Sequence, residues 1–430
     1  MSTVFVISLG CPKNLTDTET MLGSLLAKGH TLVQEESGAD AVLLNTCAFI
    51  KPARAEAERE IRRLCALKRK GRIGKVLVAG CLVQKNGAAL QAQFPDVDVF
   101  AGLGAIEKIA RLLEKSQHCF GPAPATLHLP RYKAQATAPH SAYLKIADGC
   151  NNRCAYCTIP EIRGPFRSKP VEEILLEARD MALRGVTEIS VIAQDTTNYG
   201  SDLYGRPALL SLLKKMTGID GINWIRLMYV YPEKIDRALL EFMASSPKIC
   251  RYLDMPLQHS ADSVLKAMNR RCTGLQLADK VRLIRRLVPG IAIRTNFITG
   301  FPGETERDFN SLLEFIETNE FENVGVFTYW REPGTPAAAM KKQVPQALKQ
   351  ARAEALIKAQ SRVVDRLNRR LLNTETDIIA DTARTGRMPC DAPDIDGYVE
   401  IKTRTPLVPG RIVRVKITGA KGYARTAVLA

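Results

Sequence analysis

The feature that most restricts the fold of this chain is the alternation of short apolar runs with helical segments along most of its length. In the first hundred residues the apolar runs are 4–10, 41–46 and 75–80, and helical patterns follow at 17–27 and 53–70. Alternating strands and helices are typical of a parallel sheet covered by helices. The sequence therefore predicts an N-terminal open parallel α/β sheet.

Each of these three predicted strands ends at a cysteine, namely Cys11, Cys47 and Cys81. The carboxyl ends of parallel strands line one common crevice, so we expect the three thiols to meet in space. A single free cysteine at such a place is often just a small buried residue. Recurrence at the same place in three units favours a shared role, and we infer a 4Fe-4S cluster with three protein ligands and one open iron.

A second triplet lies in one short loop, where Cys150, Cys154 and Cys157 fall within eight residues. Three thiolates at this spacing can hold three irons of a 4Fe-4S cluster and leave the fourth open for a substrate or cofactor. A zinc site would require a fourth ligand nearby, and a disulfide knot would require an oxidising compartment. The spacing therefore favours a second cluster with an open iron.

Composition narrows the class of protein. The chain has 430 residues, of which 46% are hydrophobic and 25% charged, as in a globular protein of two or three domains. No apolar run reaches the length of a membrane span and no leader pattern begins the chain, which predicts a cytoplasmic protein without a membrane partner. Eleven cysteines in a reducing compartment favour metal binding, and the net charge of +16 suggests an anionic partner such as RNA or a ribonucleoprotein particle.

The alternation resumes after a proline-containing stretch. Six further strands are expected at 142–146, 188–193, 224–230, 251–257, 292–299 and 322–329, with helices between them. Six such units make a partial (β/α)6 barrel, whose chemistry gathers at the carboxyl ends of the strands. The polar residues near these ends that could hold a cofactor are Gln194, Asp195, His259, Arg294 and Asn296.

The last part of the chain changes to short alternating strands at 376–381, 398–402, 412–418 and 425–429, which predicts a small antiparallel β-barrel. We therefore divide the chain into an N-terminal domain (1–118), a linker (119–139), the partial barrel (140–360) and the C-terminal barrel (365–430). A turn in the last domain carries Asp391, Asp394 and Asp396. Such a turn would repel phosphates and attract a basic protein, so we expect it to bind substrate.

The loop pattern Cys-x-x-x-Cys-x-x-Cys after the first strand of a partial barrel resembles the radical S-adenosylmethionine (SAM) enzymes, and Tyr156 stands where they commonly have an aromatic residue. With Cys11, Cys47 and Cys81 ahead of it, the chain resembles the methylthiotransferases over essentially its whole length. The segments 193–200, 229–232 and 255–260 look like the RimO branch, which modifies an aspartate of small-subunit ribosomal protein S-twelve. The C-terminal barrel is similar to the TRAM domain of the family.

The resemblance implies two 4Fe-4S clusters and SAM as cofactors. SAM would bind the open iron of the cluster on Cys150, Cys154 and Cys157 and be cleaved to methionine and a 5′-deoxyadenosyl radical, while the auxiliary cluster on the N-terminal triplet would supply a methylated sulfur. The SAM contacts would be made by Tyr156, Gln194, Asp195 and Arg294. The expected product is an aspartate of protein S-twelve that carries a methylthio group on its β carbon.

The expected partners are ribosomal protein S-twelve or the small ribosomal subunit, together with a low-potential electron donor such as flavodoxin or ferredoxin, and nothing requires more than a monomer. One alternative is the MiaB branch, which performs the same chemistry on an adenosine of transfer RNA. Another is a non-enzymatic iron-sulfur protein that binds RNA or carries electrons, which leaves the two open irons unexplained. Cleavage of SAM that depends on Cys154 would exclude the second alternative.

Overall fold

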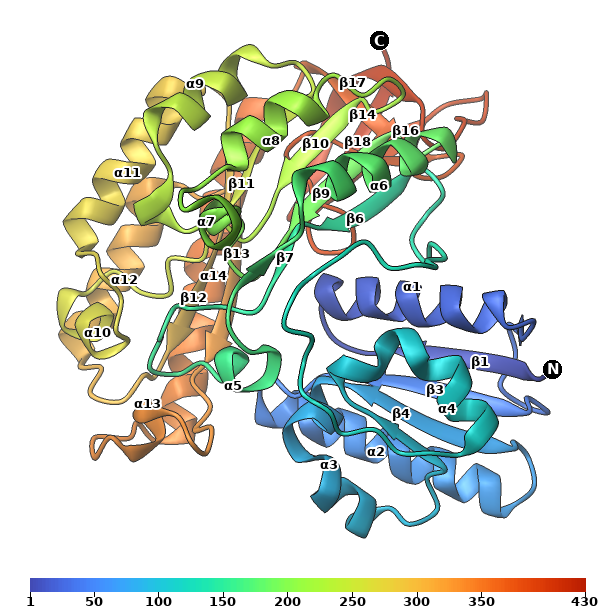
Figure 1. The fold of residues 1–430 in the computed structure, drawn as a ribbon. Coiled ribbons are helices and arrows are strands. Elements are labelled where there is room, and N and C mark those ends of the chain that lie inside the picture. Colours follow the sequence, from blue (N-terminus) through green and yellow to red (C-terminus); the bar gives the residue numbers. More distant parts are fainter. The chain divides into compact units, whose positions relative to one another are not determined.

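The computed structural model describes residues 1–430, and the chain forms two compact units (Figure 1). The first unit comprises residues 1–136, 145–153 and 157–173. The second comprises residues 137–144, 154–156 and 174–430. Two cysteines of the short loop, Cys150 and Cys157, thus belong to the first unit, and Cys154 belongs to the second.

The first unit is built on a five-stranded sheet with the strand order β2-β1-β3-β4-β5, in which all neighbours are parallel. Its strands are β1 (Thr3–Ser8), β2 (Thr31–Leu32), β3 (Ala41–Thr46), β4 (Lys75–Gly80) and β5 (Val99–Ala101). Its helices are α1 (Pro12–Ala27), α2 (Lys51–Arg69), α3 (Cys81–Gln93), η1 (Leu103–Lys108) and α4 (Ile109–Lys115). The predicted parallel sheet is confirmed, and two short edge strands, β2 and β5, were not expected from the sequence.

Both faces of this sheet are buried, because successive side chains of a strand point to opposite sides. In β3, Val42 and Leu44 join the core that α2 and α3 cover, and Ala41 and Leu43 join the core that α1 and α4 cover. A sheet covered on both faces has continuous apolar strands, as the sequence shows. The carboxyl ends of these strands are therefore left as the place where polar chemistry can be built.

The rest of the first unit is the segment around the short cysteine loop. It contains β7 (Ala147–Asp148), β8 (Arg167–Ser168) and the short helix α5 (Ile159–Arg163), and β7 and β8 pair in antiparallel fashion. The side chain of Ile162 in α5 enters the same core as the helices α2 and α3. The segment that follows the loop is thus packed onto the N-terminal sheet domain.

The second unit contains an open six-stranded sheet with the order β13-β12-β11-β10-β9-β6. Its strands are β6 (Ser141–Lys145), β9 (Glu188–Ile192), β10 (Trp224–Leu227), β11 (Ile249–Asp254), β12 (Ala292–Thr299) and β13 (Asn323–Thr328). The pairings from β9 to β13 are parallel, and the predicted partial barrel of six strands is confirmed.

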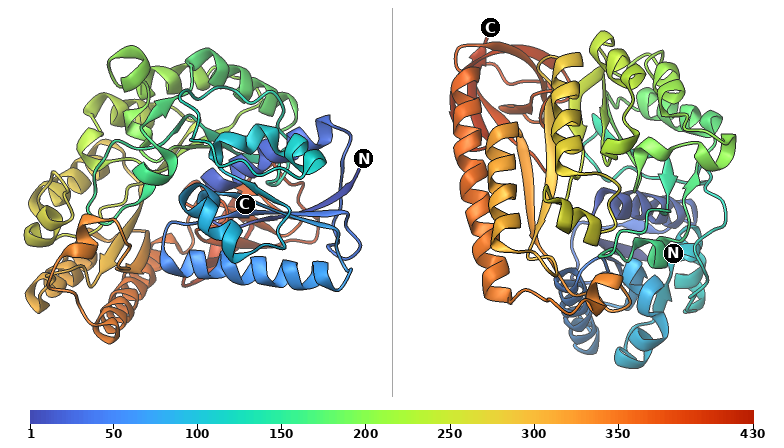
Figure 2. Two further views of the ribbon diagram at one scale, coloured as in Figure 1. Left: turned by 60° about the horizontal axis from the view of Figure 1, so that its bottom comes forward. Right: turned by 90° about the vertical axis from the view of Figure 1, so that its left-hand side faces the viewer.

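Helices connect these strands and cover the sheet. They are α6 (Val171–Leu183), η2 (Thr196–Asn198), α7 (Ser201–Tyr204), α8 (Leu209–Met216), η3 (Pro232–Lys234), α9 (Arg237–Ser245), α10 (Asp262–Ala267), α11 (Gly274–Leu287), α12 (Glu306–Asn319), α13 (Pro336–Ala339) and α14 (Gln346–Leu371). Helix α14 runs beside α12 and β13 and leads into the C-terminal barrel (Figure 2). None of the helices has the length and apolar character that a membrane span requires.

The C-terminal part is a closed barrel with the strand order β14-β15-β16-β18-β17. Its strands are β14 (Glu375–Ala380), β15 (Thr385–Arg387), β16 (Tyr398–Lys402), β17 (Ile412–Lys421) and β18 (Ala424–Leu429). Four of its pairings are antiparallel, but β16 and β18 pair in parallel. The barrel predicted from the sequence is therefore present, with one more strand and a mixed rather than purely antiparallel sheet.

A buried ionic network joins this barrel to the six-stranded sheet. Glu188, the first residue of β9, binds Arg226 of β10 through one carboxylate oxygen at 2.9 Å and Arg387 of β15 through the other at 2.7 Å. Arg387 also pairs with Asp381, which lies 2.9 Å from His140. Burial acts to raise the pKa of Glu188, but the two guanidinium groups outweigh it and hold that pKa below its usual value.

We predict that Glu188→Ala destabilises the second unit by about 3–5 kcal/mol, because it leaves two buried guanidinium groups without their shared carboxylate. Denaturant unfolding of the purified protein measures this change. The charged Glu188 carboxylate stabilises the fold at pH values above the usual carboxyl pKa. This stabilisation is lost as the pH falls through the lowered pKa that Glu188 has in the folded state. The exposed control Glu354→Ala on α14 should change stability by less than about 0.5 kcal/mol. Equal stability of the two variants would contradict the network's role.

Candidate functional site

Three cysteines of the first unit stand at the carboxyl ends of neighbouring strands. Cys11 lies between β1 and α1, Cys47 directly follows β3, and Cys81 is the first residue of α3 after β4. Because β1, β3 and β4 are adjacent and parallel, the three residues lie at one edge of the sheet. This is the placement that the sequence predicts.

Two glycines allow the backbone to approach closely at this edge. Gly10, before Cys11, has φ +100°, and a Cβ atom there would lie 2.9 Å from Cβ of Cys47. Gly80, before Cys81, has φ +97°, and a Cβ atom there would lie 2.1 Å from Oδ1 of Asn45. Only glycine is free of both the strained backbone and the clash. These positions therefore serve to bring the cysteine-bearing turns together.

Two thiols of the triplet, those of Cys81 and Cys47, have raised pKa values. Burial raises the pKa of the Cys81 thiol to about 12, the positive charge of Arg163 acts against this, and Cys11 and Cys47 add to the rise. Burial likewise raises the pKa of Cys47, with Cys11 adding to it. Cluster binding would have to displace the protons of these thiols.

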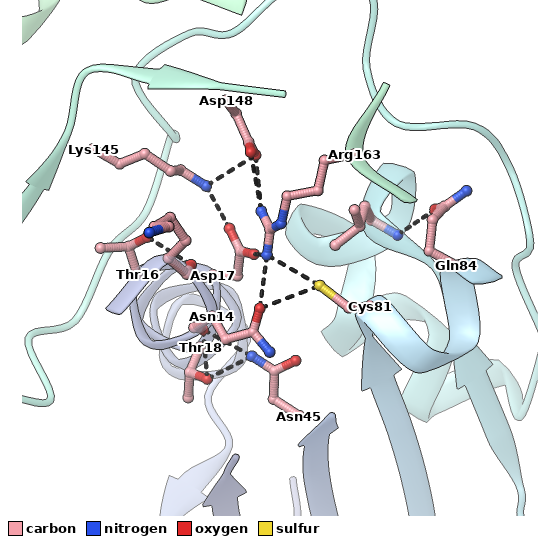
Figure 3. Close-up of polar contacts among 12 residues, drawn as sticks. Asn14, Thr16, Asp17, Thr18, Asn45, Cys81, Gln84, Lys145, Asp148 and Arg163 are labelled. Carbon is pink, nitrogen blue, oxygen red and sulfur yellow. Dashed lines mark hydrogen bonds and ion pairs between the residues drawn. The ribbon is translucent and has the colours of Figure 1, made fainter. Parts of the chain in front are cut away.

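A polar network lies beside Cys81 (Figure 3). Arg163, the last residue of α5, is 1% exposed. Its Nη2 donates to Oδ1 of Asn14 at 2.7 Å and to Asp17 at 2.8 Å, and it lies 3.3 Å from Sγ of Cys81. Its Nη1 donates to Asp148 at 2.9 Å. The segment after the short cysteine loop thus reaches the N-terminal cysteines through this side chain.

Lysine and amide groups complete the network. Lys145 binds Asp17 and lies 3.5 Å from Asp148, so two cations face two carboxylates and their charges cancel. Asn14 donates from its Nδ2 to the carbonyl of Thr46 at 2.9 Å, directly before Cys47. Buried charges persist only when paired in this way. The network is therefore a fixed part of the site rather than a surface feature.

In the first unit, the short loop is held by backbone contacts around Cys150 and Cys157. The amide of Cys150 donates to the carbonyl of Gly164 at 3.2 Å, and the amide of Ile159 donates to Sγ of Cys157 at 3.4 Å. A cavity of about 290 Å³ opens here, lined by Cys150, Asn151, Arg153, Pro160 and Pro165. An N–H group directed at a cysteine sulfur is a usual feature of iron-sulfur loops.

In the second unit, Cys154 contacts a tyrosine that follows β10. The hydroxyl of Tyr231 lies 3.5 Å from Sγ of Cys154, and the guanidinium of Arg270 lies 4.5 Å from the centre of the Tyr231 ring. Burial raises the pKa of Tyr231 well above its usual value, so the phenol stays protonated and can donate a hydrogen bond to the sulfur. The amide of Ala155 donates to the carbonyl of Met268 at 3.0 Å and fixes the middle of the loop.

All four predicted SAM contacts belong to the second unit. Tyr156 is partly buried, and its ring meets Phe301 edge-on at 6.4 Å between centroids. Gln194 and Asp195 follow the carboxyl end of β9. Gln194 is partly exposed, whereas Asp195 is buried and accepts a hydrogen bond from Lys234 at 2.6 Å. They remain candidates on the basis of this placement.

The structure gives the fourth predicted SAM contact a different role. Arg294 is the third residue of β12, and its guanidinium is 2.5 Å from Asp396 of the C-terminal barrel. Asp396 is fully buried as a side chain and also accepts a hydrogen bond from Tyr252 at 2.7 Å. Because the C-terminal barrel already pairs with Arg294, we leave this residue out of the proposed SAM contacts.

The acidic turn also differs from the expectation of an open substrate surface. The side chain of Asp391 is fully buried and pairs with Arg425 at 2.9 Å, and Asp396 pairs with Arg294. Only Asp394 is exposed, and its carboxylate accepts a hydrogen bond from Tyr143 at 3.3 Å. Asp391 therefore stabilises the C-terminal barrel itself, and Asp396 stabilises its contact with the six-stranded sheet. Asp394 alone remains a candidate for contact with the substrate.

Sequence reasoning missed Arg163, Asp17 and Lys145 as site residues. These three come from different helices and strands and match no short motif, so their meeting depends on the tertiary fold. One signal was available, since Arg163 and Lys145 flank the cysteine loop and a charged residue beside such a loop is a candidate partner for it. All eleven cysteines are free thiols, and no group of three or more His, Cys, Asp or Glu side chains is placed so that it could hold a metal ion. The cluster assignment therefore rests on the placement and chemistry of the cysteines.

Comparisons with known proteins agree with this layout. Residues 3–102 match the family described as "Uncharacterized protein family UPF0004", residues 144–316 match the radical SAM superfamily, and residues 372–428 match the TRAM domain. Among solved structures, the radical SAM methyltransferase TsrM from Kitasatospora setae aligns with a TM-score of 0.59 at 14% identity, covering 78% of this chain and 76% of that one. At this identity the likeness shows the fold.

Full-length relatives show the family. The chain is 58% identical over 426 residues to the ribosomal protein uS12 methylthiotransferase RimO of Elusimicrobium minutum, covering 99% of each chain. It is 45% identical to the protein of that name in Pelotomaculum thermopropionicum and 43% identical to that in Geobacter sulfurreducens, covering 97% or more of every chain compared. The chain therefore belongs to the RimO family of radical SAM methylthiotransferases.

Proposed function

We propose that this chain transfers a methylthio group to the β carbon of an aspartate in ribosomal protein uS12, the protein S-twelve named above. The observation that carries the proposal is the likeness to a RimO protein over 99% of the chain. In addition, the N-terminal cysteines lie at strand ends, and the second triplet lies in one short loop. As a radical SAM enzyme it uses SAM and a 4Fe-4S cluster. The finer assignments below are part of the proposal.

The six cysteines would hold two 4Fe-4S clusters. Cys150, Cys154 and Cys157 would ligate the SAM-binding cluster, and Cys11, Cys47 and Cys81 would ligate the auxiliary cluster. When bound, the first cluster supplies reductive SAM cleavage, and the second supplies sulfur at an open iron. Thiolates are the ligands that iron-sulfur clusters prefer, and the placement of Cys11, Cys47 and Cys81 at the carboxyl ends of adjacent strands supports this assignment.

The chain's own groups have supporting roles in this proposal. The amide of Ile159 and the hydroxyl of Tyr231 would donate hydrogen bonds to the sulfurs of Cys157 and Cys154. Tyr156, Gln194 and Asp195 would contact SAM from the carboxyl-end side of the sheet. Such groups orient a cofactor and exclude water from the reacting carbon.

The remaining partners follow from this chemistry. Each SAM cleavage consumes one electron, so a low-potential donor such as flavodoxin or ferredoxin is required, and uS12 would be met as free protein or within the small ribosomal subunit. We place the reaction in the cytoplasm, where ribosomes are, and expect a monomer. The division into domains at 1–118, 140–360 and 365–430, with 119–139 as linker, is proposed on the same basis.

The proposal is tested with the reconstituted protein, SAM, a strong reductant and uS12 under anaerobic conditions. Formation of 5′-deoxyadenosine together with a methylthio-sized mass gain on one aspartate of uS12 is the expected result. Formation of 5′-deoxyadenosine without any change in uS12, but with a methylthio group on transfer RNA, would contradict the substrate assignment.

We predict that Asp394→Lys weakens uS12 binding by up to about fivefold, because an exposed ion pair contributes up to about 1 kcal/mol. The affinity for uS12 is measured at low and high salt, and the loss should shrink as salt increases. Asp365→Lys on α14 makes the same charge change at another exposed site and should leave the affinity unchanged. Equal affinities of both variants would remove the acidic turn from the substrate surface.

A further inference from the structure

A buried guanidinium lies directly beside one cysteine of the auxiliary triplet (Figure 3). Nη2 of Arg163 is 3.3 Å from Sγ of Cys81, and both residues are buried. Burying a guanidinium is unfavourable unless its N–H groups find partners. The buried position of Arg163 therefore depends on polar contacts and is not explained by packing alone.

The surrounding groups fix this guanidinium in place. Asp148 binds Nη1 at 2.9 Å, and Asp17 and Asn14 accept from Nη2 at 2.8 Å and 2.7 Å. Lys145 contacts both carboxylates from the other side. A side chain held by this many partners has little freedom to turn away, so its distance to Cys81 is set by the fold.

The role of the Cys81 sulfur changes when it becomes a ligand. As a thiol it donates to Oδ1 of Asn14 at 3.3 Å. As an iron-bound thiolate it has no proton and can only accept a hydrogen bond. Arg163 then places a charged N–H donor within reach of that sulfur. Hydrogen bonds to cluster sulfurs and nearby positive charge favour the reduced, more negative state of a cluster.

We propose that Arg163 is a positioning residue that donates an N–H···S hydrogen bond to Cys81 and raises the reduction potential of the auxiliary cluster. This inference rests on the proposed function, which puts that cluster on Cys11, Cys47 and Cys81. Arg163 ends the helix that follows the loop of Cys150 and Cys157. The same segment that carries ligands of the SAM-binding cluster thus also sets the charge beside the auxiliary cluster.

The test uses the full chain with its loop cysteines Cys150, Cys154 and Cys157 all replaced by Ala, which leaves only the auxiliary cluster. In this background, Arg163→Met removes the N–H donors and the charge, and Lys145 remains to pair Asp17 and Asp148. Arg163→Lys keeps the charge without the forked donors. Arg167→Met is the matched control, since Arg167 is a buried arginine of the same segment whose Nη1 donates to the carbonyl of Pro165 at 3.0 Å.

Iron content and the midpoint potential are measured for each variant by metal analysis and by a redox titration followed by electron paramagnetic resonance. We expect Arg163→Met to keep its iron and to shift the reduction equilibrium about tenfold against the reduced state, equivalent to about 59 mV for one electron. Arg163→Lys should shift it less, and Arg167→Met should not shift it.

Unchanged potentials in both Arg163 variants at full iron content would overturn the inference. Loss of iron from both Arg163 variants, with Arg167→Met intact, would also overturn it, because Arg163 would then be needed only to assemble the site. Absence of iron from the parent background would instead refute the auxiliary cluster of the proposed function.

Discussion

Replacement of Cys154 by Ala is expected to reduce 5′-deoxyadenosine formation to the level seen without enzyme. A 4Fe-4S cluster with an open iron needs three protein thiolates, and the loop offers Cys150, Cys154 and Cys157. Cys154 is 8% exposed and has the hydroxyl of Tyr231 at 3.5 Å, so no water-borne ligand can readily take its place. The measurement is chromatography of the products after anaerobic incubation with SAM and a strong reductant.

The matched control is Cys119→Ala, which removes a cysteine outside both triplets. It should retain SAM cleavage at the level of the unchanged protein. If the Cys154→Ala variant cleaved SAM at that same level, the loop would be refuted as the cluster site. The alternative of a non-enzymatic iron-sulfur protein would then have to be considered again.

The second large effect is expected from the simultaneous replacement of Cys11, Cys47 and Cys81 by Ala. The variant should lose about half of the iron of the anaerobically purified protein and all methylthio transfer. It should still cleave SAM, because the loop cysteines are intact. Iron analysis, product chromatography and the mass of uS12 measure the three quantities on one preparation.

The two triplets should behave differently, because the proposed function assigns radical formation to the loop triplet and sulfur delivery to the N-terminal triplet. The complementary variant, with the three loop cysteines replaced by Ala, should also lose about half of the iron but should lose SAM cleavage as well. Unchanged iron content in the N-terminal triple variant would eliminate the auxiliary cluster.

The strand and helix pattern was sufficient to predict the position of the N-terminal cysteines. Apolar runs that end at Cys11, Cys47 and Cys81 become β1, β3 and β4, and their adjacency follows from the rules for parallel sheets. The short strands β2 and β5 carry too few residues to show a period, so they were missed. Strand β15, with three residues, was missed for the same reason.

The buried ionic contacts could not be predicted from the sequence. Asp391 and Asp396 stand in a turn with the composition of an exposed acidic loop, yet Arg425 and Arg294 neutralise them. Arg163 reaches Cys81 across 82 positions of sequence. Such pairings depend on which elements pack together, and local composition carries no record of this. The polar partners of the site residues could therefore be identified only from the structure.

The modification of uS12 by this protein is tested by a mass comparison of ribosomal protein uS12 and of transfer RNA nucleosides from cells with and without the protein. We predict that a methylthio-sized increment on one aspartate of uS12 is lost from the cells that lack the protein, while the nucleosides are unchanged. Loss of the increment from a nucleoside, with uS12 unaltered, would contradict uS12 as the substrate.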